Sequence, residues 1–488
     1  MVSDWFLPER ERPWTAGNLV VPHVHGADYF ARLLDVVGAT QSGDRIFFTD
    51  WRGDADERLG PDGPTIGELL EAASGRGVEV RALLWRSHSD KMRFNAQANR
   101  HLGAVVNEAG GEALFDERVR RGGSHHQKLL VVRRQGRPQD DVAFVGGIDL
   151  CHGRRDDAGH HGDPQPVELD ERYGPHPPWH DASLEIRAPA VSDVLEVFSE
   201  RWDDPTPLDH RNPYQALLHR RAGMPRHPKP LPESWDPPPA CGPHQVQILR
   251  TYPAKRPAFP FAPDGERSIA HAYERAFARA RRLVYVEDQY FWSETVTRTL
   301  ADALRREPTL QVIAVVPRFP EEDSVLSGTP MRLGQQRASD LLRAAGGERF
   351  AMYDLENAAG TPVYVHAKVC IVDDAWMTCG SDNLNLRSWT HDSEVTCAVV
   401  DPDGDLPRRL RATLWSEHLG LPADDARLTD VEGAMALWAQ RAGEPGARIR
   451  RHVLPRVRRA AAVWAGPAYR LAFDPDGRPR RLRGTDRF

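Results

Sequence analysis

Hydrophobic positions in this 488-residue chain fall into short runs rich in valine, isoleucine and aromatic residues, and one run also carries ionisable groups. The run at residues 363–373 lies between a proline and an aspartate, and its composition predicts a buried strand. Because side chains alternate between the faces of a strand, His366 and Lys368 should share one face and Asp373 the other. Two ionisable groups side by side on a core strand are unfavourable unless an anion or a reaction uses them. This strand is therefore the first candidate for a functional site.

The same pattern occurs earlier in the chain, where His126 and Lys128 lead into another apolar run. Asp50 lies 76 residues before His126 (126 − 50), and Asp288 lies 78 residues before His366 (366 − 288). Amphipathic helix patterns precede these aspartates at Phe30, Leu33, Leu34 and Val37 and at Ile269, Tyr273, Ala276 and Ala280. Further strands are expected at residues 78–85 and 310–316. An internal duplication of one α/β unit accounts for the repetition.

Two His-x-Lys strands, the second completed by Asp373, resemble the duplicated HxKxxxxD motif of the phospholipase D superfamily. Residues 380–388, Gly-Ser-Asp-Asn-Leu-Asn-Leu-Arg-Ser, are similar to the GSxNxxxRS stretch of that family. Further segments resemble the long phospholipases D of eukaryotic type, at residues 146–154, 179–181, 287–291, 392–394 and 414–419. The resemblance extends from about residue 20 to about residue 420.

The duplication and the resemblance together imply an α/β fold of two α-β-α layered halves related by a pseudo-twofold axis. We expect four regions: a first half at 20–203, a proline-rich connector at 204–245, a second half at 246–420 and a basic C-terminal extension at 421–488. Residues 441–488 contain 13 arginines and 4 acidic residues, with aromatic residues between them. Such a tail either rests on anionic lipid headgroups or is solvated and partly disordered.

The first copy departs from the family motif at Arg133, which occupies the position of the motif aspartate. This position faces away from His126 and Lys128, so we expect an anchoring role, with Asp140 or Asp141 across a hairpin turn offsetting the change. The two copies also differ from each other, because Asp149 lies where the second copy has Asn383. Long phospholipases D also carry aspartate there.

The resemblance implies that both His-x-Lys pairs face one pocket and act on a phosphodiester. Lys128 and Lys368 would hold its non-bridging oxygens, with Asn383 and Ser381 as further donors and Asp149 and Asp373 as supports. One imidazole would attack phosphorus to form a phosphohistidine, while the other protonates the leaving alkoxide and then activates water or an alcohol. In that family the histidine of the N-terminal motif is often taken as the nucleophile, and the resemblance assigns this role to His126.

A histidine that attacks through one ring nitrogen needs an acceptor for the other nitrogen. Each half supplies a carboxylate at a matching place after its His-x-Lys strand. On this basis Asp181 is assigned to His126, and Glu394 is assigned to His366. Because the lysines neutralise the phosphate, we expect no metal and no cofactor.

The loop at residues 152–180 contains five histidines. Metal binding through His160, His161 and Asp163 is one interpretation. A solvated polar loop over the site is favoured, because no strict ligand spacing occurs. Long loops of this kind often serve as lids.

Composition narrows the setting in which the protein works. The net charge of −6 argues against a nucleic-acid partner, which favours basic grooves. The five cysteines are scattered and odd in number, as expected for reduced thiols in the cytoplasm. Neither a signal peptide nor a membrane-spanning run is predicted, which argues against the membrane-embedded cardiolipin synthase branch. We expect a cytoplasmic monomer that binds a small-molecule diester and attaches peripherally to phospholipid membranes.

The resemblance implies a phospholipase D that hydrolyses the distal phosphodiester of phosphatidylcholine-like lipids to phosphatidate and a head-group alcohol, with transphosphatidylation as a side activity. Two alternatives remain open. One is a metal-independent phosphodiesterase or nuclease that uses the same histidines and lysines. The other is a catalytically weak binding protein in which Arg133 has impaired the first half.

Overall fold

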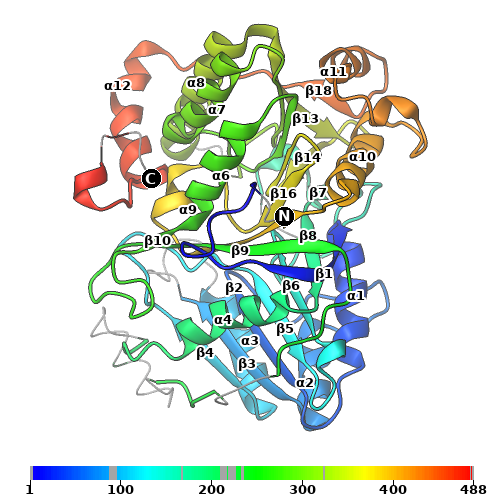
Figure 1. Ribbon diagram of the computed structural model, residues 1–488, viewed down its shortest axis with the longest axis vertical. Coiled ribbons are helices and arrows are strands. Elements are labelled where there is room, and N and C mark those ends of the chain that lie inside the picture. Colours follow the sequence, from blue (N-terminus) through cyan, green and yellow to red (C-terminus); the bar gives the residue numbers. More distant parts are fainter. Residues whose placement is uncertain are drawn as a thin grey trace.

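The structure is a computed structural model that describes residues 4–86, 96–165, 169–208, 217, 227–231, 236–321, 325–483, 485 and 488. Its strands form two equivalent groups that meet at β1 (Thr15–Val24) and β9 (His244–Tyr252), with helices packed outside them (Figure 1). The two groups correspond to the two halves predicted from the repeat.

The first half has the strand order β4-β3-β2-β5-β6-β8-β1. Its further strands are β2 (Arg45–Asp50), β3 (Glu79–Trp85), β4 (Glu112–Asp116), β5 (Leu129–Arg133), β6 (Val142–Gly146) and β8 (Ala182–Arg187). Its helices are α1 (Gly26–Gly38), α2 (Ile66–Gly75), α3 (Ala96–Glu108) and α4 (Ala190–Trp202). Alternation along β2 explains the layers: Ile46 and Phe48 pack in the cluster with α1 and α2, and Phe47 packs in the cluster with α4.

The second half has the strand order β13-β12-β11-β15-β16-β17-β9. Its further strands are β11 (Leu283–Glu287), β12 (Gln311–Val315), β13 (Phe350–Glu356), β15 (Val369–Val372), β16 (Trp376–Gly380) and β17 (Glu394–Val400). Its main helices are α6 (Ser268–Arg279), α7 (Glu294–Arg306), α8 (Val325–Gly346) and α10 (Asp405–Leu419). The short strand β10 (Glu266–Arg267) pairs with β9, and α9 (Leu386–Thr390) follows β16.

The predicted duplication is confirmed strand by strand. In each half three strands are parallel and the others are antiparallel, and the two orders match position for position. The match extends to single hydrogen bonds, because Asp50 accepts the backbone N–H of Leu150 and Asp288 accepts that of Leu384. The equivalent strands β1 and β9 pair antiparallel, which is the relation that a local twofold axis produces.

The largest core lies where the halves meet. It joins the inner faces of both strand groups to α4 and α10, and it buries Phe198, Trp202 and Trp415 completely. Full burial of a large apolar side chain contributes about 1.5–3 kcal/mol. This shared core fixes the position of one half against the other.

The predicted continuous strand at 363–373 is wrong in one respect, because it is two strands. β14 (Pro362–Val365) pairs in parallel with β7 (Trp179–His180) of the first half, whereas β15 pairs with β11 of its own half. The chain changes partner at His366-Ala367-Lys368, which belongs to neither strand. The functional segment therefore lies at the break between two pairings.

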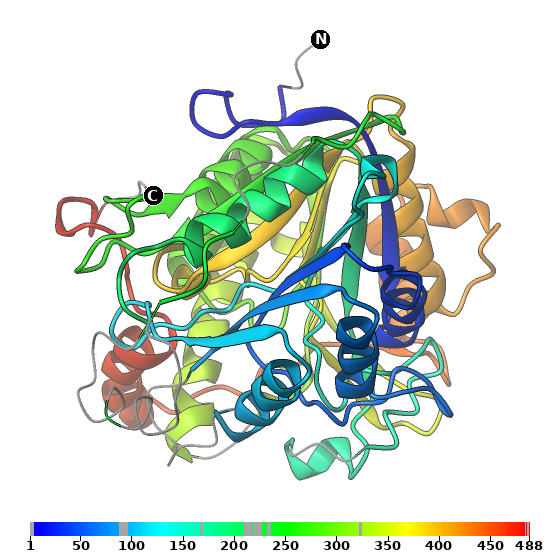
Figure 2. The same cartoon turned by 90° about the horizontal axis from the view of Figure 1, so that it is seen from below.

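Most of the predicted proline-rich connector, 204–245, falls between α4 and β9, and part of it lies outside the described residues. The C-terminal region forms α11 (Ala434–Ala442), β18 (Ile449–Arg451) and α12 (Arg459–Ala468). β18 adds to β13, and α12 lies against α8, as Figure 2 shows in red and light green. Phe488 is buried against Trp389. The described part of this region is thus packed on the second half, which disagrees with the alternative of a solvated, partly disordered tail.

Among the described residues, no helix has both the length and the apolar character needed to cross a membrane. The five cysteines are unbonded, and four of them are buried; Cys241 is exposed.

Candidate active site

The two histidines pair with carboxylates across the halves. His126 Nδ1 lies 2.9 Å from Glu394 Oε2, and His366 Nδ1 lies 2.6 Å from Asp181 Oδ2. The sequence-based assignment of Asp181 to His126 and of Glu394 to His366 is therefore wrong. Each imidazole from one half is oriented by a carboxylate from the other half.

Backbone pairing explains the exchange. The N–H of His126 donates to the carbonyl of Ser393, and the N–H of His366 donates to that of His180, at 2.9 and 2.8 Å. Ser393 and His180 are the residues that directly precede the two carboxylates. Each His-x-Lys segment thus runs beside the carboxylate-bearing segment of the opposite half, so neither half contains a complete site.

The two lysines lie close to their own histidines, although neither His-x-Lys segment is part of a strand. Lys128 Nζ donates to the carbonyl of His126 at 3.3 Å, and Lys368 Nζ donates to that of His366. Lys128 also forms an ion pair with Asp149 at 3.0 Å. Lys368 instead lies 3.3 Å from the amide oxygen of Gln289. Burial lowers the pKa of Lys368 to about 8, against partial compensation by Asp181.

Both imidazoles are held in the neutral form. Burial, and then the neighbouring Lys128, lowers the pKa of His126 well below its usual value, and burial and Lys368 do the same for His366. The charge of Lys368 also acts on His126, and that of Lys128 acts on His366, so the two segments adjoin. With each Nδ1 bound to a carboxylate, each Nε2 is available for attack on phosphorus or for proton transfer.

The carboxylates are buried and specifically supported. Burial, and then Asp392, raises the pKa of Glu394 to about 8, and burial raises the pKa of Asp181. A Cβ at Gly147 would lie 2.2 Å from Asp181 Oδ1, so this position requires glycine. The Ser381 hydroxyl donates to Glu394 Oε2 at 2.6 Å. Ser381 therefore supports a carboxylate, instead of being the free phosphate donor that the sequence suggested.

Asn383 has the opposite character. Its buried Oδ1 has no hydrogen-bond partner in the described part of the chain. An amide oxygen without a partner is costly to bury, and a ligand that donates a hydrogen bond at this point would relieve the cost.

The aspartate positions of the two motifs anchor strands. The carboxylate of Asp373 accepts the backbone N–H groups of Arg281, Arg282 and Leu283, and so ties the end of β15 to β11. In the first half Arg133 lies 2.9 Å from Asp141. This is one of the two compensating acids that the sequence proposed.

The second candidate, Asp140, lies at the exposed turn, 3.8 Å from Arg137. The substitution at position 133 therefore lies in the strand scaffold, away from the imidazoles.

Several groups at the site were missed in the sequence. The Trp51 ring lies 6.0 Å from the His126 ring, and the Trp179 ring lies 5.0 Å from the His366 ring. Arg154 stacks over Trp179 and lies 3.6 Å from Asp149. A signal was present in the repeat, because Trp51 and Gln289 directly follow the matched residues Asp50 and Asp288.

The metal site first considered, at His160, His161 and Asp163, does not form. His161 is exposed, and Asp163 pairs with Arg155 at 3.4 Å. His160 is buried and turns toward other partners.

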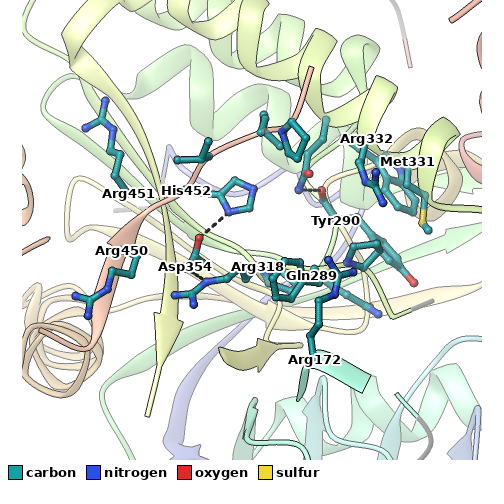
Figure 3. A pocket seen from close by; sticks show the side chains of 18 residues that line it. Arg172, Gln289, Tyr290, Arg318, Met331, Arg332, Asp354, Arg450, Arg451 and His452 are labelled. Carbon is teal, nitrogen blue, oxygen red and sulfur yellow. Dashed lines mark hydrogen bonds and ion pairs between the residues drawn. The ribbon is translucent and has the colours of Figure 1, made fainter. Parts of the chain in front are cut away.

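A cavity of about 370 Å³ lies next to the site (Figure 3). Gln289, which contacts Lys368, forms part of its wall. Its lining includes five arginines and a single acidic residue, Asp354, which accepts a hydrogen bond from Arg318 and pairs with His452. The arginines are Arg172, Arg318, Arg332, Arg450 and Arg451. Apolar side chains, among them Trp292 and Phe319, complete the wall.

Comparison with known proteins agrees with this geometry. The family model described as phospholipase D matches residues 54–221, and the model described as cardiolipin synthase, PLD-like domain, matches residues 273–415. Phospholipase D alpha 2 from Oryza sativa subsp. japonica is 27% identical over 525 residues, covering 78% of this chain and 62% of the relative. Phospholipase D alpha 1 from Vigna unguiculata is 26% identical over 568 residues, covering 88% and 68%.

Among solved structures, phosphatidylserine synthase from Haemophilus influenzae Rd KW20 has the same fold, with a TM-score of 0.56 at 15% identity over 88% of this chain and 95% of that chain. A duplicated α/β fold that brings one His-x-Lys segment from each half together defines the class of this protein. The chain belongs to the phospholipase D superfamily. It spans about three fifths to two thirds of the length of the two curated relatives described.

Proposed function

We propose that this protein is a phospholipase D that hydrolyses the distal phosphodiester of glycerophospholipids such as phosphatidylcholine, releasing phosphatidate and the head-group alcohol. The observation that carries the proposal is the pair of crossed couples, His126 with Glu394 and His366 with Asp181. Two imidazoles with free Nε2 atoms and two lysines match the requirements of a two-step displacement at phosphorus. The naming of the plant relatives as phospholipases D supports the same activity.

In the first step one Nε2 attacks phosphorus, and the P–O bond to the head group breaks. The other imidazole donates its proton to the departing alkoxide, which leaves as the alcohol. In the second step that imidazole, now neutral, takes a proton from water, and the hydroxide oxygen displaces the phosphohistidine nitrogen to give phosphatidate. A primary alcohol in place of water gives the transphosphatidylation product. We assign the attack to His126, following the family resemblance.

The anionic diester also affects the protonation of the two imidazoles. In the free site burial keeps both imidazoles neutral, whereas an anion beside them favours the protonated form. Substrate binding therefore raises the pKa of the imidazole that must act as acid. Lys128, Lys368 and the amide of Asn383 would bind the non-bridging oxygens, which is why the reaction requires no metal.

The cavity beside Gln289 offers room for one end of the lipid next to Lys368. Its mixture of guanidinium and apolar groups suits an amphiphile. Head-group preference is the property that this wall would control.

Peripheral attachment to a membrane, from the cytoplasmic side, is part of the proposal. Exposed large apolar side chains are concentrated in the C-terminal region, at Val453, Val463, Trp464 and Leu471. Arginines lie between them in the sequence, as on surfaces that contact anionic lipid.

The decisive test is head-group release from mixed-lipid vesicles containing phosphatidylcholine, phosphatidylethanolamine and phosphatidylglycerol, without added metal. We expect phosphatidate to form, and phosphatidylethanol to form when ethanol is added. Protein quenched in alkaline denaturant should contain a phosphohistidine that is stable to base and lost on acid treatment. Cleavage of plasmid DNA without lipid turnover would establish the nuclease instead. Absence of turnover on lipid, DNA and a generic diester would establish the weak binding protein.

Membrane attachment is tested separately by vesicle flotation. Deletion of 441–488 is a poor test because it removes β18 and the buried Phe488. Trp464→Ala with Leu471→Ala should weaken binding to anionic vesicles, and Val21→Ala, an exposed apolar position in the first half, should not. Equal binding of both variants would remove the C-terminal surface from the proposal.

A further inference from the structure

A second cluster of ionisable side chains lies behind the catalytic residues, and the proposed reaction does not use it. Four imidazoles and two carboxylates gather there, from His25, His160, His180, His418, Glu287 and Glu417. Three of the histidines belong to the first half, and both residues of α10, Glu417 and His418, belong to the second. The cluster thus crosses the boundary between the halves.

Four of these side chains point one donor atom at a common position. The donor atoms of His25, His160, His180 and Glu417 all lie within 4.8 Å of one another. His25 Nε2 lies 2.6 Å and His160 Nε2 lies 3.0 Å from the Glu417 carboxylate, and His180 Nδ1 lies 3.7 Å from it. Three nitrogens and one oxygen at this spacing are a ligand set that fits a tetrahedral Zn²⁺ ion after a small adjustment.

The outer nitrogens of two rings are already engaged in the way that metal-binding histidines require. His160 Nδ1 donates to the carbonyl of Trp179 at 3.1 Å, and His180 Nε2 donates to Glu287 at 2.7 Å. With the outer nitrogen as donor, the inner nitrogen carries the lone pair.

Glu287 serves as the outer acceptor and is not itself a ligand in this arrangement. It accepts from His180, from His418 Nε2 at 2.8 Å and from the Tyr285 hydroxyl at 2.6 Å. Both of its oxygens are therefore occupied by donors. The carboxylate fixes two rings from opposite halves at once.

Hydrogen bonding within the protein leaves this cluster incomplete. His180 is fully buried, and its Nδ1 has no hydrogen-bond partner in the described structure, although it is directed at Glu417. A buried nitrogen without a partner is destabilising, and a bound cation would remove that cost. His25 and His160 also hold positive φ angles of 75° and 54°, which are unfavourable for residues other than glycine.

We propose that His25, His160, His180 and Glu417 bind a divalent transition-metal ion, with Zn²⁺ the best match to the nitrogen-rich ligand set. On binding, the protons now shared between Glu417 and the rings of His25 and His160 are released. The ion has a structural role and takes no part in phosphoryl transfer. Its existence does not depend on which diester the protein cleaves.

The position of the ion links it to the active site. The carbonyl of His180 accepts the backbone N–H groups of His366 and Ala367, at 2.8 and 3.2 Å. The next residue, Asp181, orients the His366 ring. An ion on the His180 side chain would therefore fix the segment that positions His366, and it would join that segment to α10.

The test uses the full chain, freed of metal with a chelator and reloaded with Zn²⁺ or Co²⁺. We expect one Zn²⁺ per chain by elemental analysis, a rise in Tm on reloading, and a visible Co²⁺ absorption spectrum of tetrahedral type. His160→Gln and Glu417→Gln should lose all three. His161→Ala is the matched control, because it changes the exposed neighbour on the same loop, and it should retain them.

Two results would overturn the proposal. One is wild-type protein that binds no stoichiometric Zn²⁺ and gives no tetrahedral Co²⁺ spectrum; the cluster is then a hydrogen-bonded network only. The other is undiminished binding in both glutamine variants. If these variants do not fold, the wild-type Co²⁺ spectrum, which distinguishes nitrogen ligation in a tetrahedral site from adventitious surface binding, decides the matter alone. The metal-binding experiment does not depend on lipid turnover, so failure of the enzymatic proposal would leave its result unaffected.

Discussion

The two His-x-Lys segments share one scaffold, but they differ in charge. Lys128 forms an ion pair with Asp149, whereas Asn383 lies at the corresponding place in the second half. Lys368 forms no ion pair among the described residues, and the side chain that its ammonium contacts is the neutral Gln289. The first lysine is thus neutralised within its own half. The charge of the second is offset only in part, by Asp181 and then by Asp288 and Asp149, and burial lowers its pKa to about 8.

This difference indicates that the two duplicated halves have different roles at the site. The second half supplies a lysine without a direct ion pair, which attracts a phosphate, while the lysine of the first half is neutralised by Asp149. Because of the crossed carboxylates neither half can act alone, since each imidazole depends on the other half for its orientation. Four predictions test this account.

The largest effect is expected from the imidazoles themselves. His126→Ala and His366→Ala should each lower kcat by about 10⁴-fold or more, because each removes a group needed in both steps. The double variant should be little worse than either single one, since residues that act as a unit are not additive. Initial rates of head-group release measure this. If one single variant keeps substantial activity, the two imidazoles do not serve one reaction.

The crossed carboxylates should rank second. Asp181→Asn and Glu394→Gln should each lower kcat by about 10²–10⁴-fold, because an amide holds the ring in the wrong tautomer. The downfield Nδ1–H signal of His366 in the proton NMR spectrum should disappear in Asp181→Asn and persist in Glu394→Gln. The opposite pattern would show that each histidine pairs with the carboxylate of its own half.

The sequence allowed much of this to be predicted, for physical reasons. The repeated His-x-Lys pattern located both functional segments, and the repeat located the matched aspartates Asp50 and Asp288. Turn chemistry offered Asp140 or Asp141 as the acid that offsets Arg133, and in the structure Asp141 forms the ion pair. These features depend on residues that are near in sequence or equivalent by duplication.

Features that depend on contact between the halves could not be obtained in this way. The equal spacing of Asp181 and Glu394 within their halves suggested pairing inside each half, but the segments interdigitate. The partner change at His366 requires β7 of the first half, which no local pattern reveals. The role of Ser381 was missed for a related reason, because it follows from the position of Glu394.

The third prediction concerns pH and distinguishes the two lysines. Lys368, with a pKa of about 8, loses its charge as pH rises, so kcat/KM should fall about tenfold per pH unit above that value. Lys368→Arg should remove this alkaline limb, even at reduced activity, because a guanidinium does not titrate there. Lys128→Arg should retain it. An alkaline limb that survives in Lys368→Arg would assign it elsewhere, with Glu394, whose pKa is also about 8, as the next candidate.

The smallest effect on catalysis is expected at Arg133, where the first motif departs from the second. Arg133→Ala leaves the imidazoles untouched, so kcat should stay within about threefold of wild type. It also leaves Asp141 buried without its cation, so the free energy of unfolding should fall by about 1–3 kcal/mol, as urea denaturation would measure. Burial already raises the pKa of Asp141 to about 6, and loss of Arg133 raises it further.

The protonated carboxyl costs less to bury, so the stability deficit of Arg133→Ala should shrink as pH falls toward 5. Arg133→Asp restores the motif residue but places a second carboxylate beside Asp141, and it should be less stable than Arg133→Ala at pH 7. Asp140→Ala, at the exposed turn, is the control and should change neither property. If Arg133→Ala abolishes turnover while the fold is retained, position 133 acts on the chemistry, and the halves differ in more than the charge around their lysines.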